Sequence, residues 1–132
     1  MKLLLDNNLS PKVARAIHEL IKGEGSQAVA LRDRFEAETP DIEWISALGR
    51  EGGWAVISGD QQITRNRAER AAWLQTTLVG FFLEPALARL DPLPQTARLI
   101  LWLPVLERQL GLIRGPALFA LPLRSTSRLR QL

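Results

Sequence analysis

The 132-residue sequence contains no cysteine, which excludes disulfide bonds, thiolate zinc sites and cysteine nucleophiles. This composition suits a reducing compartment, and we expect a cytoplasmic protein. The N-terminus reaches the acidic Asp6 too early for a signal peptide. The most apolar stretch, residues 99–106, is short and contains Pro104, so we expect no membrane-spanning helix.

Several catalytic motifs are also missing. The sequence has neither a Gly-x-x-x-x-Gly-Lys-Ser/Thr loop nor a Gly-x-Gly-x-x-Gly loop, the usual phosphate-binding patterns. His18 is the only histidine, and it falls on a predicted helix away from the predicted site, which favours a structural role. Ser58 has no neighbouring histidine and no nucleophile-elbow context, so serine hydrolase chemistry is unsupported.

The charge of the chain is +3 overall and unevenly distributed. Residues 1–60 carry 7 basic and 10 acidic side chains, whereas residues 61–132 carry 10 basic side chains, all arginine, and 4 acidic ones. An acidic first half and an arginine-rich second half fit a metal site beside a polyanion-binding surface. The alternative is that the arginines are ordinary solvated residues.

Apolar runs and helix-start signals predict alternating strands and helices. We expect strands at residues 2–6, 27–31, 54–58, 76–83 and 117–123, the last at a sheet edge because Pro122 limits pairing. We expect helices at residues 11–22, from 40 to around 49–53 and at 95–110, the last with a bend or break at Pro104. Residues 61–73 are expected to form a helix or a helical loop, and residues 84–94 a connector.

This order predicts an α/β fold, a three-layer α/β/α sandwich around a mainly parallel sheet of four to five strands. One domain is expected over residues 1–123, followed by a basic C-terminal tail at residues 124–132.

Two predicted strands each lead directly to an aspartate: Asp6 at the end of the first and Asp60 in the turn after the third. Apolar runs without alternation are typical of strands buried on both faces of a parallel sheet. Such sheets place ligand sites beyond the carboxyl ends of their strands, so we expect Asp6 and Asp60 at one edge, where they can share a divalent metal ion. Asp41 and Glu43, at the start of the second helix, belong to the same edge.

Unpaired carboxylates repel one another unless a cation or a raised pKa relieves them, and Mg²⁺ prefers such oxygen ligands. Each acid also has an ordinary alternative, because Asp6 and Asp60 can form turns, Asp41 can favour a helix N-terminus and Glu43 can be solvated. The auxiliary candidates are Asn7, Gln62, Asn66 and Glu69, and the candidates for holding phosphates are Arg65, Arg67 and Arg70.

Three segments carry a resemblance to a known family. They are Leu-Leu-Leu-Asp-Asn-Asn-Leu-Ser-Pro at residues 3–11, Thr-Pro-Asp-Ile-Glu-Trp-Ile at residues 39–45 and Val-Ile-Ser-Gly-Asp at residues 56–60. In this order they resemble the PIN-like nucleases, in particular the small bacterial PIN-like ribonuclease toxins of type II toxin–antitoxin modules. The resemblance covers residues 1 to about 85.

The resemblance implies an endoribonuclease that uses Mg²⁺ or Mn²⁺. The acids of the family fall on Asp6, on Asp41 with Glu43 as the alternate, and on Asp60. Relatives often carry a further acid two residues after the third-strand aspartate, where this chain has Gln62, and Glu69 is the candidate replacement.

We therefore predict the toxin of a type II toxin–antitoxin pair, with Asp6, Asp60 and Asp41 as metal ligands and with RNA and a cognate antitoxin as partners. A catalytically degenerate PIN-like fold that binds nucleic acid or protein is the alternative, because of Gln62. The apolar residues 99–106 predict either a fully buried helix or an interface with an antitoxin or a second copy of the chain.

Overall fold

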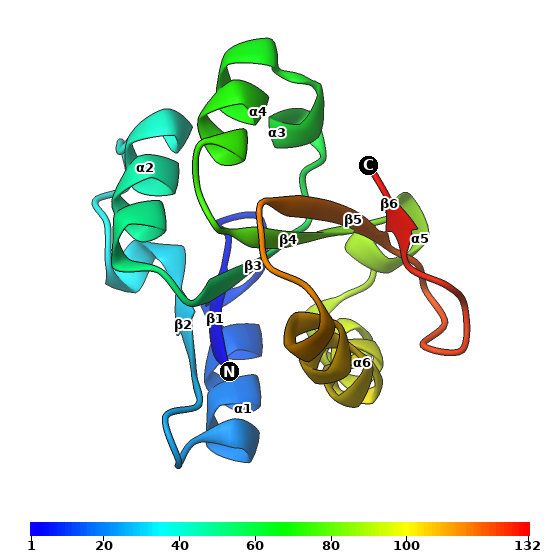
Figure 1. The fold of residues 1–132 in the computed structure, drawn as a ribbon. Helices are drawn as coiled ribbons and strands as arrows, with labels where there is room; N and C mark the ends of the chain where they lie inside the picture. Colours follow the sequence, from blue (N-terminus) through cyan, green and yellow to red (C-terminus); the bar gives the residue numbers. More distant parts are fainter.

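The computed structural model describes residues 1–132 as one six-stranded sheet with helices on both faces (Figure 1). The strands are β1 (Lys2–Leu5), β2 (Gln27–Ala30), β3 (Trp54–Ser58), β4 (Val79–Leu83), β5 (Ala117–Leu121) and β6 (Arg130–Gln131). The helices are α1 (Pro11–Ile21), the 3₁₀ helix η1 (Leu31–Asp33), α2 (Asp41–Glu51), α3 (Gln62–Arg65), α4 (Arg67–Leu74), α5 (Pro85–Ala88) and α6 (Pro92–Leu112). The predicted fold class is confirmed.

The strands are arranged in the order β2-β1-β3-β4-β5-β6. The first five are parallel and β6 is antiparallel to β5. Helix α1, after β1, and helices α3 and α4, after β3, cover opposite faces of the sheet (Figure 1). The adjacent strands β1 and β3 therefore form a switch point, the place where open α/β sheets bind ligands beyond their carboxyl ends.

Each face of the sheet has its own apolar core. The core under α1 and α6 includes Leu3, Leu5, Val13, Ile17, Phe81, Leu99 and Trp102. The core under α2, α3 and α4 includes Leu4, Trp44, Ile45, Val56, Ile63, Trp73 and Phe82. Successive residues of a strand point to opposite faces of the sheet, and both faces are buried here. The residues on both sides of such a strand must therefore be apolar, which explains the unbroken apolar runs of β1 and β3.

Helices α2 and α4 pack closely where α2 carries Gly49. A Cβ atom at Gly49 would lie 2.7 Å from Thr76 Cβ, just after α4, so only glycine fits there without a shift of one helix. Gly52, with φ of +75°, ends α2 in a conformation that disfavours L side chains. This pair of helices is thus fixed by backbone geometry as well as by the core.

The expectation of an edge strand at residues 117–123 is wrong. Strand β5 pairs with β4 on one side and with β6 on the other. Pro122 lies just beyond the end of β5, so its missing N–H costs the ladder no hydrogen bond. Two residues are too short a strand to be recognised from an apolar pattern, which is why β6 was not predicted.

Helix α6 is longer than expected and runs unbroken through Pro104. Pro104 is exposed, so water can bind the carbonyl group that its missing N–H leaves free. The predicted connector at residues 84–94 contains α5 and the first turn of α6, and the predicted helix at 61–73 divides at Asn66 into α3 and α4. Most of residues 99–106 pack on the sheet, whereas Leu101 is 59% exposed.

Residues 124–132 return to the body of the protein. The N–H of Leu132 donates to the carbonyl of Leu118 at 2.8 Å, and Arg70 of α4 donates to the carbonyl of Leu132 at 3.2 Å. This basic segment therefore connects β5 to α4. None of the helices combines the length and the hydropathy needed to cross a bilayer.

Candidate metal-binding edge

Asp6 and Asp60 follow the two central strands, as the sequence predicts. Strands β1 and β3 are in register with Leu5 opposite Ile57, and the N–H of Asp6 donates to the carbonyl of Ile57 at 2.9 Å. Asp6 is only 8% exposed, whereas Asp60 is exposed. The carboxyl edge thus presents one buried aspartate beside one accessible aspartate.

The buried carboxylate of Asp6 has two hydrogen-bond donors. Its Oδ1 accepts from the N–H of Asn7 at 2.6 Å, and its Oδ2 accepts from the hydroxyl of Ser58 at 3.0 Å. Burial raises the pKa of Asp6, and these two hydrogen bonds act in the opposite direction. The charges of Asp41 and Asp60 raise the pKa of Asp6 further, so this group favours binding of a proton or a cation.

Ser58 joins the two aspartate turns, a role that the sequence reasoning missed. Its hydroxyl, fully buried at the end of β3, lies against Asp6 and also accepts the N–H of Asp60 at 3.1 Å. A hydroxyl can do both because it is a donor and an acceptor. The available signal was a polar residue inside an apolar strand, two positions before an aspartate.

The turn after β3 is held by two further contacts. Asn8 Oδ1 accepts the N–H of Gly59 at 2.8 Å, and Asp60 Oδ1 accepts the N–H of Gln62 at 2.8 Å. The second contact is an Asx turn, so Asp60 has its ordinary structural role as well as a place at the edge. Gln62 itself is exposed and contributes only this backbone N–H to Asp60.

Asp41 and Glu69 come from neighbouring helices. Asp41, the first residue of α2, accepts the indole N–H of Trp44 at 2.8 Å. Glu69 lies in the first turn of α4, whose start is capped by Asn66 Oδ1 accepting the N–H of Glu69 at 3.0 Å. Partial burial raises the pKa of Glu69, and Asp41 raises it further through its charge and a shared hydrogen bond.

The carboxylates of Asp60 and Asp6 also raise the pKa of Glu69. Asp6, Asp41, Asp60 and Glu69 therefore lie within electrostatic range of one another, and we call these four residues the acidic edge. Glu69, in the first turn of α4, is thus the fourth acid near this edge. Glu43 is exposed and is not among the groups that shift the pKa of Asp6 or of Glu69.

The remaining residues that the sequence suggests for the site lie at different positions around this edge. Asn7 is exposed and offers its backbone N–H to Asp6. Arg65 and Arg67 are exposed near the turn after β3. Arg70 is half-buried and donates to the backbone carbonyls of Thr64 at 3.4 Å and of Leu132 at 3.2 Å.

The acidic edge offers carboxylate oxygens, which are the ligands that hard divalent ions prefer. The raised pKa values of Asp6 and Glu69 also favour a bound cation. The side chains, however, do not form a complete metal site, because no three acidic or imidazole groups converge closely enough to hold one ion. One oxygen of Asp41 and one of Asp60 already accept hydrogen bonds from Trp44 and Gln62.

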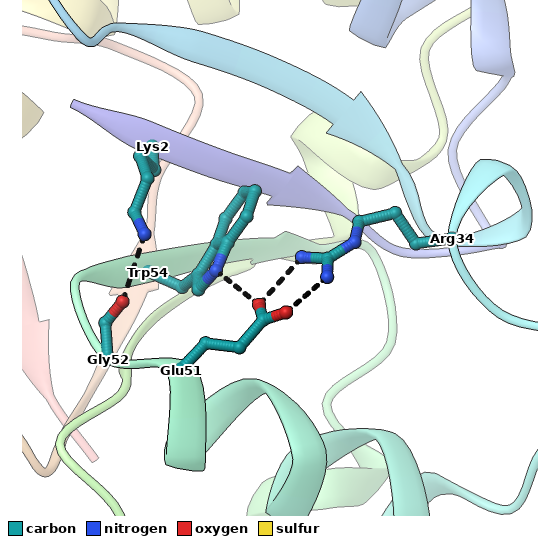
Figure 2. A network of polar contacts seen from close by, with 5 residues as sticks. All are labelled: Lys2, Arg34, Glu51, Gly52 and Trp54. Carbon is teal, nitrogen blue, oxygen red and sulfur yellow. Dashed lines mark hydrogen bonds and ion pairs between the residues drawn. The ribbon is translucent and has the colours of Figure 1, made fainter.

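A different polar group lies at the opposite end of α2 (Figure 2). Arg34 forms a two-pronged ion pair with Glu51, one bond of which, Nη1 to Oε2, measures 2.8 Å. Glu51 Oε2 also accepts the indole N–H of Trp54 at 2.8 Å, and Lys2 Nζ donates to the carbonyl of Gly52 at 3.1 Å. We call Lys2, Arg34, Glu51 and Trp54 the amino-edge network.

The amino-edge network is fully paired. Both cations lie over the ring of Trp54, Lys2 Nζ at 4.8 Å and Arg34 Cζ at 5.0 Å from its centroid. The hydrogen bond from Arg34 lowers the pKa of Glu51 to about 2. This network joins the end of α2 to β1 and β3, and it gives the other end of α2, with Asp41, a fixed support.

An open α/β sheet with carboxylates beyond its central strands defines the class of fold. A family model described as a PIN-like domain matches residues 1–85, more than half of the sequence, and the chain belongs to this family. The predicted resemblance is thereby confirmed, and because PIN-like domains are generally nucleases, the fold is of a nuclease type. Comparisons with curated proteins and with solved structures return no match.

Proposed function

We propose that this protein is a metal-dependent endoribonuclease and the toxin of a type II toxin–antitoxin system. One observation carries the proposal: the buried Asp6 lies within electrostatic range of Asp41 and Asp60, with no cation from the protein to neutralise them. Unrelieved repulsion of this kind destabilises a fold and is characteristic of sites that serve a ligand. Because the fold is of a nuclease type, we infer that the ligand is a metal ion used in RNA cleavage.

In this proposal Asp6, Asp60 and Asp41 hold Mg²⁺ or Mn²⁺, the ions typical of PIN-like domains, and Glu69 supplies the fourth carboxylate. An ion bound there would activate water and offset the negative charge that develops on the phosphodiester group. Ser58 fixes the carboxylate of Asp6 and the Asp60 turn in one arrangement. Glu43, exposed in the first turn of α2 two residues after Asp41, remains the alternate to Asp41 in the proposal.

The arginines after β3 fit the contact with RNA. Arg65 and Arg67 are exposed and form no hydrogen bond or ion pair within the protein, so both are free for phosphates. Arg70 is committed to two backbone carbonyls, and we assign it the role of holding α4, and with it Glu69, in position.

The toxin assignment rests on the resemblance to small bacterial PIN-like toxins and places the protein in the cytoplasm with its RNA and its antitoxin. It is tested by inducible expression of the chain in a bacterial host, alone and together with the protein encoded beside it. We expect growth arrest that the neighbouring gene product relieves. Growth arrest that also occurs with Asp6→Asn would show that RNA cleavage is not its cause.

The nuclease activity is tested on a labelled single-stranded RNA in Mg²⁺, in Mn²⁺ and in excess chelator. We expect cleavage that the chelator stops and that Asp6→Asn abolishes with an unchanged circular dichroism spectrum. Glu107→Gln, at an exposed site on α6, is the matched control and should cleave normally. Unchanged cleavage by Asp6→Asn would contradict the proposal.

A degenerate PIN-like binding module is the second candidate function. It is favoured by the finding that no three acids converge on one point. The two candidates separate in calorimetry with MnCl₂ and in RNA-binding measurements. A nuclease should bind the ion and cut RNA, whereas a binding module should bind RNA without binding the ion.

A further inference from the structure

The carboxyl edge has a second feature, a pocket of about 290 Å³ beside Asp60. The turn after β3 forms one wall with Gly59 and Gln61, and Arg65 extends this wall. Pro85 and Ala88, from the segment after β4, form an apolar wall. Arg89, at the end of α5, completes the lining. The pocket thus lies at the carboxyl ends of β3 and β4.

The charge of this pocket is positive and uncompensated. Arg65 and Arg89 line it, and no acidic residue does. Both side chains are exposed, and neither donates a hydrogen bond or forms an ion pair within the protein. Arg34 and Arg70, in contrast, are bound to protein acceptors. Two free guanidinium groups at one concavity favour an anion with several acceptor oxygens, such as a phosphate.

The position of the pocket connects it with the acidic edge. Gly59 and Gln61 flank Asp60 in the chain, so the pocket and the acidic edge share one turn. Gln61 Nε2 donates to the carbonyl of Leu83 at 3.4 Å, which ties this turn to the end of β4. The ligand in the pocket is therefore next to whatever the acidic edge binds.

We propose that this pocket binds one nucleotide of an RNA strand next to the phosphodiester group that is cut, with its phosphate between Arg65 and Arg89. The sugar or base of that nucleotide packs on Pro85 and Ala88, which gives the pocket an apolar side that a bare phosphate does not need. The inference rests on the proposed nuclease function and extends it, because Arg89 lies outside residues 1–85, the part matched by the family model.

Binding is measured by fluorescence anisotropy of a labelled single-stranded RNA, with every variant made in the Asp6→Asn background so that the RNA stays intact. We expect Arg89→Gln and Arg65→Gln each to raise Kd by about tenfold and to reduce the slope of log Kd against log salt by about 1. Arg98→Gln, an exposed arginine of α6 outside the pocket, is the matched control and should change Kd less than about twofold. An Arg89→Gln variant that binds like the control would overturn the proposal.

The site itself is tested without catalysis, by following the amide resonances of Gly59 and Gln61 in the wild-type protein during titration with AMP, adenosine or inorganic phosphate. We expect AMP to shift them, adenosine to shift them little, and Arg89→Gln to remove the effect of AMP. Phosphate acting as strongly as AMP, or no shift with AMP, would overturn the proposal. If RNA is not cut but AMP binds as described, the nuclease function fails and the nucleotide site stands.

Discussion

The two ends of helix α2 lie in different electrostatic surroundings. At the amino-edge network, Glu51 is paired with Arg34 and Trp54, and its pKa falls to about 2. At the acidic edge, Asp41 faces Asp6 and Glu69, whose pKa values are raised. The same helix therefore has one end whose charge is neutralised for structure and one end whose charge is left available.

This difference separates structural from functional carboxylates without reference to any ligand. A structural carboxylate loses hydration when it is buried, and an ion pair compensates for this loss. The carboxylates of the acidic edge have no such partner, so their burial and mutual repulsion cost free energy that a bound cation would offset.

Removal of one charge at each end should affect RNA cleavage very differently. We expect Glu69→Gln to slow Mg²⁺-dependent cleavage by at least about tenfold, as for a group that binds or orients a metal ligand. Glu51→Gln, at the amino-edge network, should keep more than about half of the wild-type rate, since it lies at the other end of α2. Single-turnover rates on one RNA measure both variants. Equal losses would mean that the two ends do not differ in function.

A second prediction concerns the distance between Asp41 and Glu69. In Gly49→Ala the new methyl group meets Thr76, so α2 and α4 must separate. We expect a loss of about 1–3 kcal/mol in the free energy of unfolding, typical of overpacking, together with slower cleavage. Urea denaturation gives the first quantity. Gly111→Ala, where a Cβ meets nothing within 4 Å, is the control and should not slow cleavage.

The third prediction uses metal ions as a probe of the acidic edge. Free Mn²⁺ at about ten times its Kd should stabilise the wild type by about 1.4 kcal/mol, because it binds only the folded state. Thermal unfolding with and without MnCl₂ should show this shift for Glu51→Gln but not for Asp6→Asn. A shift in all three proteins would place the binding site elsewhere.

The smallest effect is a pH dependence of stability that differs in sign between the ends. Because the pKa of Asp6 is raised in the folded state, its charged form costs stability, and Asp6→Asn should be more stable than the wild type at pH 7. That advantage should decline as the pH falls and disappear below the ordinary pKa of 3.8. In Asp6→Asn the amide oxygen can still accept the N–H of Asn7, and the amide nitrogen can donate to the Ser58 hydroxyl, so both contacts of this side chain are kept.

Glu51→Gln should behave in the opposite way. The pKa of Glu51 is lowered, so its charge stabilises the fold above 4.5, and this contribution is lost as the pH falls toward about 2. The pair is partly exposed, with 29% of the Arg34 side chain and 42% of the Glu51 side chain accessible, so water screens it and the loss at pH 7 should be at most about 1 kcal/mol. Melting temperatures from pH 3 to pH 8 measure both variants. Parallel curves for the two variants would contradict the assigned pKa directions.

The sequence predicts most of the sheet because its information there is local. The apolar runs of β1 and β3 and the Ser10-Pro11 start of α1 are each readable from adjacent residues, and they place Asp6 and Asp60 at one edge. Because both faces of the sheet are buried, these strands do not alternate between apolar and polar residues.

What could not be predicted depends on partners distant in the chain. The ion pair of Arg34 with Glu51, the bond of Arg70 to Leu132 and the pairing of β6 with β5 join segments that no periodicity connects. The contact of Ser58 with Asp6 spans 52 positions. The nearness of Glu69 to Asp41 likewise depends on the packing of α4 on α2, which no local pattern shows.

The two apolar cores have a consequence for how this protein can change. All four residues of the acidic edge lie within residues 1–85, whereas α6, β5 and β6, which complete both cores, lie after them. Under our proposals the acids lie in the first segment, while the second segment supplies Arg89. A change at Arg89 can then alter which nucleotide is bound while the acids stay the same.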